Sequence, residues 1–434
     1  MTLSSLAGHA VELLDKIVRS DPPADKIISE FYRQRRYLGS HDRRWITEKV
    51  YGIIRNFILL REIVEECSSG LKPLNVFLLY EILIAGMEPN EISNIYSQLL
   101  ESYRLAGSEI DLESLLKCSA RQLSALKDNE FALNSFPTFF RAVLPPSVKD
   151  ECVQIMQALN HEARVCIRVD TSKISRDEAI DSFRIEGIET SPSYFSPLGL
   201  YLPGRINLNT VALYKNGAIE IQEEASQLVG LIVEPGKGEV VVDTCAGGGG
   251  KSLEFASLSG GMSEIHALDV DKERIDNLMV RAARSGYGNI SSRVVSRESF
   301  DGIEELVGCA DKVVIDAPCS GSGTIRRNPD KKFRLTRESV GKKAAYQKFL
   351  LEHYSQLVRV GGLLFYVTCS IFEEENRSVI KSFANSNRNF EFVEVSSILT
   401  EKKFSGLIED GFLSIYPHRA DMDGFFVAVM KRVG

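Results

Sequence analysis

The sequence predicts a multidomain chain of three consecutive parts: an all-α part, a small α+β part and an α/β part built on a doubly wound sheet. Three patterns predict this division. Apolar residues recur at helical spacing in the first third, strand and helix patterns mix in a short stretch that follows, and strands alternate with helices in the second half. We place the three parts at residues 1–145, 150–235 and 236–434.

The first part has the periodicity of amphipathic helices. Ile46, Val50 and Ile54 follow one another at intervals of four residues, and similar spacing runs through most of the first 144 residues. Alternation of apolar and polar residues, which would indicate strands, is rare there. Two prolines, Pro145 and Pro146, mark the end of the helical pattern.

The second and third parts contain strand patterns. In the small α+β part we expect strands at residues 163–169, 201–202 and 219–221 and a helix at 175–186. In the α/β part we expect helices at residues 272–285 and 342–358, and strands at residues 239–243, 264–269, 292–295, 312–315, 362–366 and 425–430. A sheet of this kind binds its ligand at the carboxyl ends of its strands.

Composition and charge exclude several classes of protein. The eight cysteines include no C-x-x-C pair and no histidine cluster accompanies them, which argues against a zinc site and against a disulfide framework. We find no signal-peptide pattern and no run of about 18 apolar residues, so we expect a cytoplasmic protein that contacts no membrane. The net charge of −7 disfavours indiscriminate binding of nucleic acid, although local patches matter more.

A glycine-dense turn follows the first expected strand of the α/β part. Asp243 ends that strand, and four consecutive glycines precede Lys251, where free backbone N–H groups can approach a ligand closely. A Walker A loop is excluded because the glycine it needs five positions before Gly250 is Cys245. A purely structural tight turn remains the alternative.

The next expected strand ends at Asp269, about 20 residues beyond the turn, where a carboxylate can accept hydrogen bonds from ribose hydroxyls. An aspartate at a strand end also caps helices, so alone it is a weak signal. Together with the turn it indicates a cofactor that contains adenosine. Both NAD and S-adenosylmethionine satisfy this pattern.

Two cysteines follow two further expected strands, Cys319 after Asp316 and Cys369 after Thr368. We expect these strand ends to lie side by side above the cofactor, although a single cysteine at such a place is more often a buried structural thiol. Two thiols beside such a site fit methyl transfer to carbon 5 of a pyrimidine, since that carbon is a poor nucleophile until a thiolate adds at carbon 6. At least one thiol should then have a depressed pKa.

Two basic segments are candidates for contact with nucleic acid. Residues 325–337 carry several arginines and lysines directly after the first cysteine loop, and Lys342 and Lys343 follow. A solvated charged face is the alternative. A weaker patch in the helical part consists of Tyr32, Arg33, Arg35, Arg36, Tyr37, Arg43 and Arg44.

These motifs resemble the Sun/Fmu (Nop/Sun) family of RNA cytosine-5 methyltransferases along the whole chain. The resemblance is most specific at residues 316–330 and at the Thr-Cys-Ser motif of residues 368–370 with Glu374, Glu375 and Asn376. Residues 38–44 and 50–55 are similar to the NusB-like helical domain of the bacterial ribosomal RNA members.

The resemblance implies a NusB-like RNA-binding domain, a small α+β RNA-binding unit and a Rossmann-like class I methyltransferase domain. It implies that Cys369 attacks carbon 6 and that Cys319 assists proton removal and product release, with Asp316 on the cytosine edge and Lys251 in the catalytic group. The substrate would be cytosine in RNA, most readily small-subunit (16S) ribosomal RNA, and the protein a monomer that needs no metal. The implied S-adenosylmethionine site consists of Cys245, Ala246, Gly247, Gly248, Gly249, Gly250, Lys251, Asp269 and Asp316.

The chain departs from the family at two points. The turn usually reads Cys-Ala-Ala-Pro-Gly-Gly-Lys, so the absent proline predicts a looser turn before the cofactor binds. Near residues 294–298 only Glu298 is a candidate for the usual acidic contact on the adenine side. Two other functions remain open: a DNA cytosine-5 methyltransferase with Cys319 as the nucleophile, and a non-catalytic RNA-binding assembly factor.

Overall fold

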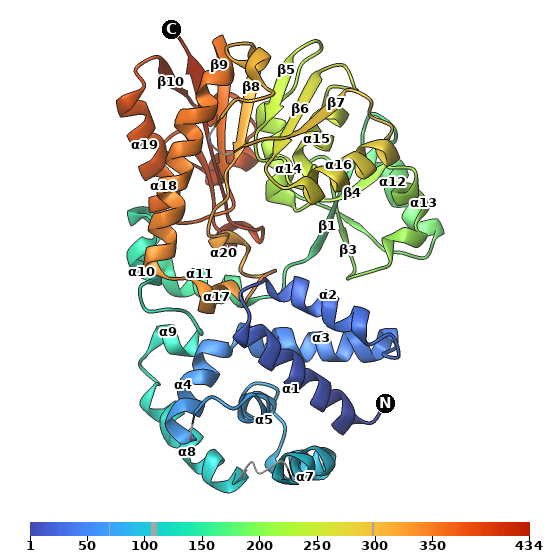
Figure 1. Ribbon diagram of the computed structural model, residues 1–434, viewed down its shortest axis with the longest axis vertical. Coiled ribbons are helices and arrows are strands. Elements are labelled where there is room, and N and C mark those ends of the chain that lie inside the picture. Colours follow the sequence, from blue (N-terminus) through green and yellow to red (C-terminus); the bar gives the residue numbers. More distant parts are fainter. Residues whose placement is uncertain (69, 106–110, 297–298) are drawn as a thin grey trace. The chain divides into compact units, whose positions relative to one another are not determined.

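The computed structural model describes residues 1–434 except residues 69, 106–110 and 297–298 (Figure 1). The chain divides into two compact units. The first contains Met1–Ala142, Ser147–His161 and Ile325–Thr336. The second contains Val143–Pro146, Glu162–Thr324 and Arg337–Gly434.

The first unit is helical, as the apolar periodicity predicts. It extends beyond the expected border at residue 145, because α11 belongs to it, and residues 325–336 return to it from the second half of the chain. Its helices are α1 (Leu3–Arg19), α2 (Ala24–Gln34), α3 (Ser40–Arg55), α4 (Phe57–Cys67), α5 (Pro73–Leu83), α6 (Pro89–Ile95), α7 (Ser97–Leu105), α8 (Leu112–Ala125), α9 (Glu130–Leu133), α10 (Phe140–Val143), α11 (Cys152–Asn160) and α17 (Lys331–Arg334).

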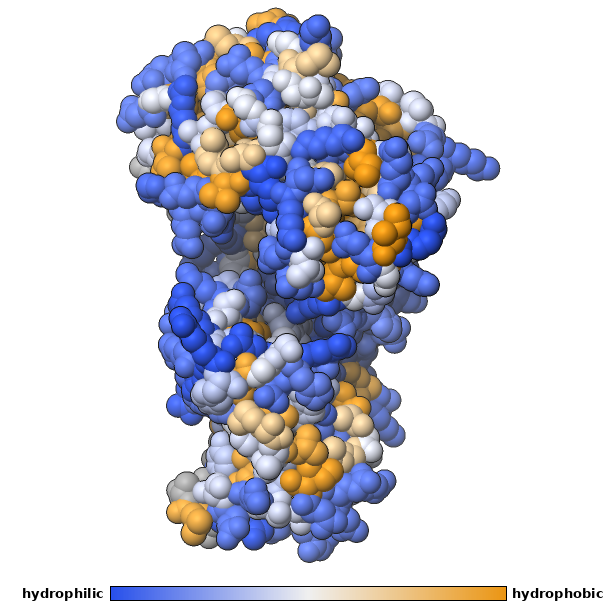
Figure 2. Space-filling model, turned by 90° about the vertical axis from the view of Figure 1, so that its right-hand side faces the viewer, coloured by the Kyte–Doolittle hydropathy of each residue, from blue (hydrophilic) through white to orange (hydrophobic). Residues whose placement is uncertain are grey.

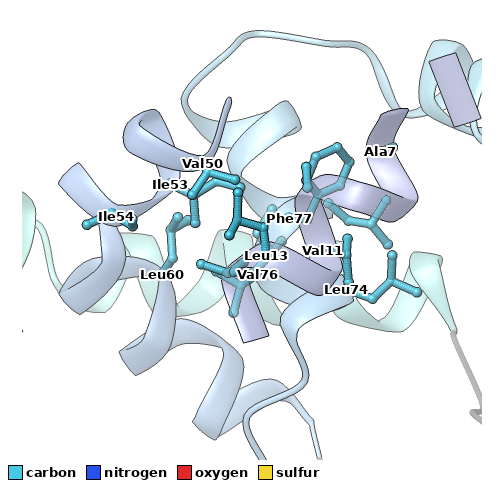
Figure 3. Packing of buried hydrophobic residues seen from close by; sticks show 14 of the residues in the cluster. Ala7, Val11, Leu13, Val50, Ile53, Ile54, Leu60, Leu74, Val76 and Phe77 are labelled. Atoms are coloured by element: carbon cyan, nitrogen blue, oxygen red, sulfur yellow. The ribbon is translucent and has the colours of Figure 1, made fainter. Parts of the chain in front are cut away.

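The core of the helical unit is formed by the apolar faces of α1, α3, α4 and α5 (Figure 3). Leu13, Val50, Ile53, Leu60 and Phe77 are fully buried in it. Burial of each such side chain contributes about 1.5–3 kcal/mol, so packing rather than helix propensity holds these short helices.

A four-stranded antiparallel sheet forms the small α+β part. Its strand order is β2-β3-β1-β4, and Ile167 at the centre of β1 pairs with both Leu200 and Ile221. The expected strands and helix are confirmed to within a few residues. The elements are β1 (Val165–Val169), α12 (Arg176–Ile185), β2 (Ser191–Pro192), β3 (Gly199–Leu202), α13 (Ala212–Lys215) and β4 (Ile219–Ile221).

The α/β part is built on a sheet that has nine strands within the described residues. Its order is β11-β12-β13-β9-β8-β5-β6-β7, with β10 beside β13. Strands β5 to β9 are parallel to one another. Strand β13 pairs antiparallel with β9, and β10 and β12 pair antiparallel with β13, as β11 does with β12. Of strands β10 to β13 the sequence predicted only β13. The strands are β5 (Val240–Asp243), β6 (Glu264–Asp269), β7 (Ile290–Val294), β8 (Ala310–Asp316), β9 (Val358–Thr368), β10 (Phe390–Val393), β11 (Ile408–Glu409), β12 (Phe412–Ile415) and β13 (Phe425–Arg432).

Helices cover both faces of this sheet, as expected for a doubly wound fold (Figure 1). Side chains alternate along each strand: Val241 packs toward α14, α15 and α16, while Val242 packs toward α18. The helices are α14 (Glu224–Val233), α15 (Gly250–Leu258), α16 (Lys272–Ser285), α18 (Arg337–Tyr354), α19 (Arg377–Ser386) and α20 (Pro417–Ala420). The face of the molecule in Figure 2 is mainly hydrophilic, with apolar side chains in small separate patches.

The cysteine pattern argued against a disulfide framework, but the structure contains one disulfide within the described residues. Cys67 at the end of α4 and Cys118 in α8 form a disulfide, with their Cα atoms 5.6 Å apart. The two residues are 51 positions apart in sequence, and the packing of α4 on α8 brings them together, so spacing rules could not find them. Within the described ranges, no cluster of side chains suits a metal ion, and no helix is long and apolar enough to cross a membrane.

Candidate active site

The two expected cysteine loops lie side by side. Strands β8 and β9 pair in parallel, with Asp316 opposite Val367, so the loops that follow them leave the same edge of the sheet. The Sγ atoms of Cys319 and Cys369 are 3.3 Å apart. The predicted adjacency of the two strand ends is thus confirmed, and both thiols can reach one small substrate group.

The pKa of the Cys319 thiol lies well above its ordinary value. The causes are its hydrogen bond with Cys369, burial, and the negative charges of Cys369 and Glu375. Cys319 therefore retains its proton in this arrangement. A thiol with a raised pKa is a poor source of nucleophilic thiolate, and its thiolate, once formed, is a stronger base.

The Cys369 loop is held by two residues of the Glu-Glu-Asn motif. The Asn376 Oδ1 atom accepts from Thr368 Oγ1 at 2.6 Å, and its Nδ2 atom donates to the Ser370 carbonyl at 2.8 Å. Glu375 accepts from the Ser370 hydroxyl at 2.6 Å. The motif thus fixes the backbone on both sides of Cys369, a function that its sequence alone did not reveal.

The glycine turn has a conformation that suits glycine. Gly247 and Gly249 have φ angles of +54° and +82°, and a Cβ atom on Gly249 would lie 2.4 Å from Leu278 Cγ. A proline at position 248 would disfavour the left-handed conformation at Gly247, so this turn differs from the usual family form. Asp269 at the end of β6 accepts from Gly247 N at 2.8 Å.

Two arginines donate to carbonyl groups of this turn. The Nη1 atom of Arg168 on β1 lies 3.0 Å from the Gly250 carbonyl, and Arg281 on α16 donates to the Gly248 carbonyl. Both hydrogen bonds oppose the looseness that the missing proline predicts. Neither arginine could be found from the sequence, because neither lies near the turn along the chain.

Lys251, which follows the turn, contacts the end of β8. Its Nζ atom lies 2.7 Å from Asp316 Oδ2. Burial alone would lower the pKa of the Lys251 ammonium, but Asp316 and Asp243 raise it above the ordinary value. The site therefore holds a positive charge beside the Asp316 carboxylate.

The residues around the turn fit an adenosine-containing cofactor. Burial raises the pKa of Asp243 to about 6, its Oδ2 atom accepts from Ser252 Oγ at 2.7 Å, and its buried Oδ1 atom has no hydrogen-bond partner in the described part of the chain. The backbone of Ala246 is tied to β6 through the Leu268 carbonyl, and burial raises the pKa of the Cys245 thiol. Asp243 is thus an additional candidate ligand residue that the sequence analysis did not select.

Part of the basic segment after the first cysteine loop is buried, whereas Arg337 and Lys342 are 67% and 75% exposed and stay candidates for phosphate contact. Arg326 and Lys332 are only 4% and 1% exposed within the helical unit. Lys332 donates to the Arg55 carbonyl at the end of α3, and Arg334 donates to the Asp21 carbonyl beyond α1. These two side chains satisfy carbonyl groups at or just beyond helix carboxyl ends, and burial together with the charge of Arg55 lowers the pKa of the Lys332 ammonium.

The second basic patch is partly occupied by internal contacts. Arg35 pairs with Glu12 at 2.6 Å, and Arg43 donates to the Leu38 carbonyl at 2.9 Å. Arg36 and Tyr37 are exposed. The remaining candidate from the sequence, Glu298, lies outside the described residues.

The strand order, the glycine turn after β5 and the acidic residue that ends β6 define an α/β protein of the class I methyltransferase fold. Residues 230–431 match the family model "16S rRNA methyltransferase RsmB/F", and residues 136–209 match the ferredoxin-like domain of the same family. The chain belongs to this RsmB/F (Sun/Fmu) family. S-adenosylmethionine is accordingly its cofactor.

Several known proteins are similar to this chain in sequence or structure. The "probable ribosomal RNA small subunit methyltransferase B" of Bacillus subtilis is 32% identical over 276 residues, which are 62% of this chain and 60% of that protein. The protein of the same printed name from Synechocystis is 27% identical over 439 residues, 97% of this chain and 98% of that one. The crystal structure of PH0851 superposes with a TM-score of 0.81 at 26% identity and covers 100% of this chain and 99% of that one.

Proposed function

We propose that this protein methylates carbon 5 of cytosine in RNA, with small-subunit ribosomal RNA as its substrate, through a covalent bond between Cys369 and carbon 6. The observation that carries the proposal is the 3.3 Å approach of the Cys319 and Cys369 sulfur atoms at the ends of neighbouring strands. Few reactions other than pyrimidine methylation need two thiols beside a cofactor site of this kind.

The chain's own groups account for the remaining steps. Cys369 as thiolate adds to carbon 6, which makes carbon 5 nucleophilic, and bound S-adenosylmethionine supplies the electrophilic methyl group. Cys319 first releases its own proton to solvent and then, as thiolate, accepts the proton of carbon 5. The electrons of that C–H bond restore the double bond between carbons 5 and 6, and Cys369 leaves carbon 6 as thiolate. Asp316 accepts a hydrogen bond from the cytosine edge, and Lys251 holds the Asp316 carboxylate.

The cofactor site proposed here comprises the glycine turn with its flanking residues and two carboxylates. The turn supplies Cys245, Ala246, Gly247, Gly248, Gly249, Gly250 and Lys251. Asp269 and Asp316 are the carboxylates, and the unpaired oxygen of Asp243 supports a polar ligand at the same place. The target base must leave any stack to reach the thiols.

The helical unit and the small α+β part are proposed to bind RNA by shape and phosphate contacts, the former as a NusB-like domain. We further propose that the protein acts in the cytoplasm as a monomer. Exposed cations such as Arg36 in the helical unit, rather than the buried Lys332, are the candidates for phosphate contacts.

A covalent trapping experiment tests the assignment of the two thiols. Cys319→Ala, incubated with S-adenosylmethionine and ribosomal RNA, should accumulate a stable protein–RNA adduct, because release of Cys369 from carbon 6 is slowed. Cys309→Ala removes an exposed free thiol and should turn over like the wild type. An adduct that forms only in Cys369→Ala would instead identify Cys319 as the nucleophile.

The substrate is tested separately in cells. Bisulfite sequencing of ribosomal RNA from cells that lack the protein should show the loss of one or more 5-methylcytosines in the small-subunit RNA. Retention of all such sites, together with no calorimetric signal for S-adenosylmethionine, would favour a non-catalytic assembly factor.

A further inference from the structure

One buried carboxylate joins the two cysteine loops. Glu375, in the short helical turn that precedes α19, is fully buried. Its Oε1 atom accepts from Ser320 N at 2.8 Å and from Gln347 Nε2 at 3.0 Å. Its Oε2 atom accepts from the hydroxyls of Ser320 and Ser370. The four donors are neutral groups, and hydrogen bonds to an ionised acceptor are roughly twice as strong as neutral ones.

The two serines directly follow the two thiols in sequence. Ser320 comes after Cys319 on the loop from β8, and Ser370 comes after Cys369 on the loop from β9. Glu375 therefore determines how far apart the two loops lie just beside the sulfur atoms. The Cys369 carbonyl also accepts from Gly323 N at 3.0 Å, so a second hydrogen bond joins the two loops at Cys369 itself.

We propose that Glu375 is a positioning residue for methyl transfer, which holds Cys319 and Cys369 at the separation that lets both reach one pyrimidine ring. The inference rests on the proposed function. Glu375 acts through Ser320 and Ser370, whose hydroxyls donate to its carboxylate. Its negative charge also contributes, after the hydrogen bond with Cys369 and burial, to the raised pKa of Cys319, which makes the Cys319 thiolate a stronger base.

The isosteric variant Glu375→Gln tests this role. An amide nitrogen in place of one oxygen would face a donor, so the bridge between the loops weakens while the side-chain volume is kept. Because small displacements of reacting groups change rates by up to about 100-fold, we expect kcat to fall by a factor of this order. The KM values for S-adenosylmethionine and RNA should stay near those of the wild type.

The neighbouring residue supplies the matched control. Glu374 is 35% exposed and lies 3.9 Å from Arg337, so Glu374→Gln should keep the wild-type kcat. Thermal unfolding of both variants measures any general loss of structure. A wild-type kcat in Glu375→Gln, or the same loss in Glu374→Gln, would overturn the proposal.

The rate of adduct formation shows whether Glu375 positions Cys369 or acts only on Cys319. In the Cys319→Ala background, Glu375→Gln should slow the appearance of the protein–RNA adduct as it slows turnover. An adduct rate equal to that of Cys319→Ala alone would show that Glu375 does not position Cys369. Absence of adduct in Cys319→Ala itself would contradict the proposed function rather than the role of Glu375.

Two milder variants keep the inference testable if Glu375→Gln does not fold. Ser320→Ala and Ser370→Ala each remove one hydroxyl from the carboxylate and leave the other donors in place. Each should lower kcat by about tenfold, the factor that corresponds to loss of a single hydrogen bond to a charged group. Wild-type kcat in both variants would refute the positioning role.

Discussion

Lys251 Nζ and Asp316 Oδ2 lie 2.7 Å apart, so an ion pair connects the residue after the glycine turn with the end of β8. The side chains of the two residues are 11% and 30% exposed. This ion pair links the glycine turn of the candidate cofactor site to the first cysteine loop. A substitution at either residue is therefore expected to affect both segments.

Asp316→Asn should therefore reduce both activity and stability. The variant leaves the Lys251 charge without its nearest partner, and burial then lowers the pKa of that ammonium. We expect the free energy of unfolding to fall by up to about 3 kcal/mol, the lower end for breaking a buried pair. Asp276→Asn breaks the exposed pair with Lys272 and should change stability by at most about 0.5 kcal/mol. Equal losses in urea unfolding of the two variants would contradict this expectation.

Arg281→Met should weaken cofactor binding. The variant removes the donor to the Gly248 carbonyl and one of two arginines that pair with Glu220. Loss of a hydrogen bond from a charged donor corresponds to about a tenfold higher Kd for S-adenosylmethionine in a calorimetric titration. Arg274→Met, on the exposed face of the same helix, should leave the Kd unchanged. A wild-type Kd in Arg281→Met would show that the turn does not depend on this contact.

Glu254→Gln should change how stability depends on pH. Burial raises the pKa of Glu254 from 4.5 to about 7, although Arg168 lies 3.8 Å away. Between these pH values the folded state keeps a proton that the unfolded state has released, so the contribution of Glu254 to stability falls as pH rises. The stability of Glu254→Gln relative to the wild type should accordingly increase by up to ~3 kcal/mol from pH 4.5 to 8.

Urea unfolding at several pH values measures this difference. Glu338→Gln, which alters an exposed pair with Lys342, should follow the wild type throughout. A relative stability of Glu254→Gln that is constant or decreases with pH would contradict the assignment of a raised pKa.

The salt dependence of RNA binding distinguishes buried from exposed cations in the helical unit. Lys332→Met should leave the slope of log K against log salt unchanged, because its ammonium donates to the Arg55 carbonyl and to Asn160. Arg36→Gln should reduce the slope by about 0.7 if it contacts one phosphate of a single strand. A smaller slope of log K against log salt for Lys332→Met would show instead that Lys332 contacts RNA phosphates, as the sequence predicted for residues 325–337.

Local patterns predicted most elements of the α/β part. The expected strand at residues 264–269 and helix at residues 272–285 coincide with β6 and α16. Their signals are local, since Asp271 caps the helix start and Gly286 ends it with a φ of +70°. The short strands β10 to β12 were missed because their pairing with β13 and with one another, rather than their own residues, defines them.

The sequence by itself determined that a glycine turn, Asp269 and two cysteines would follow strands of one sheet, because periodicity and turn residues act over a few positions. Tertiary structure decided the rest. The approach of Cys319 to Cys369, the bridge through Glu375 and the disulfide of Cys67 all join residues about 50 positions apart, as contacts across packed elements do. Lys332 was expected to bind phosphate, but it is buried and donates to the Arg55 carbonyl at the end of α3. A sequence shows that a residue is charged, but only the tertiary structure shows what surrounds it.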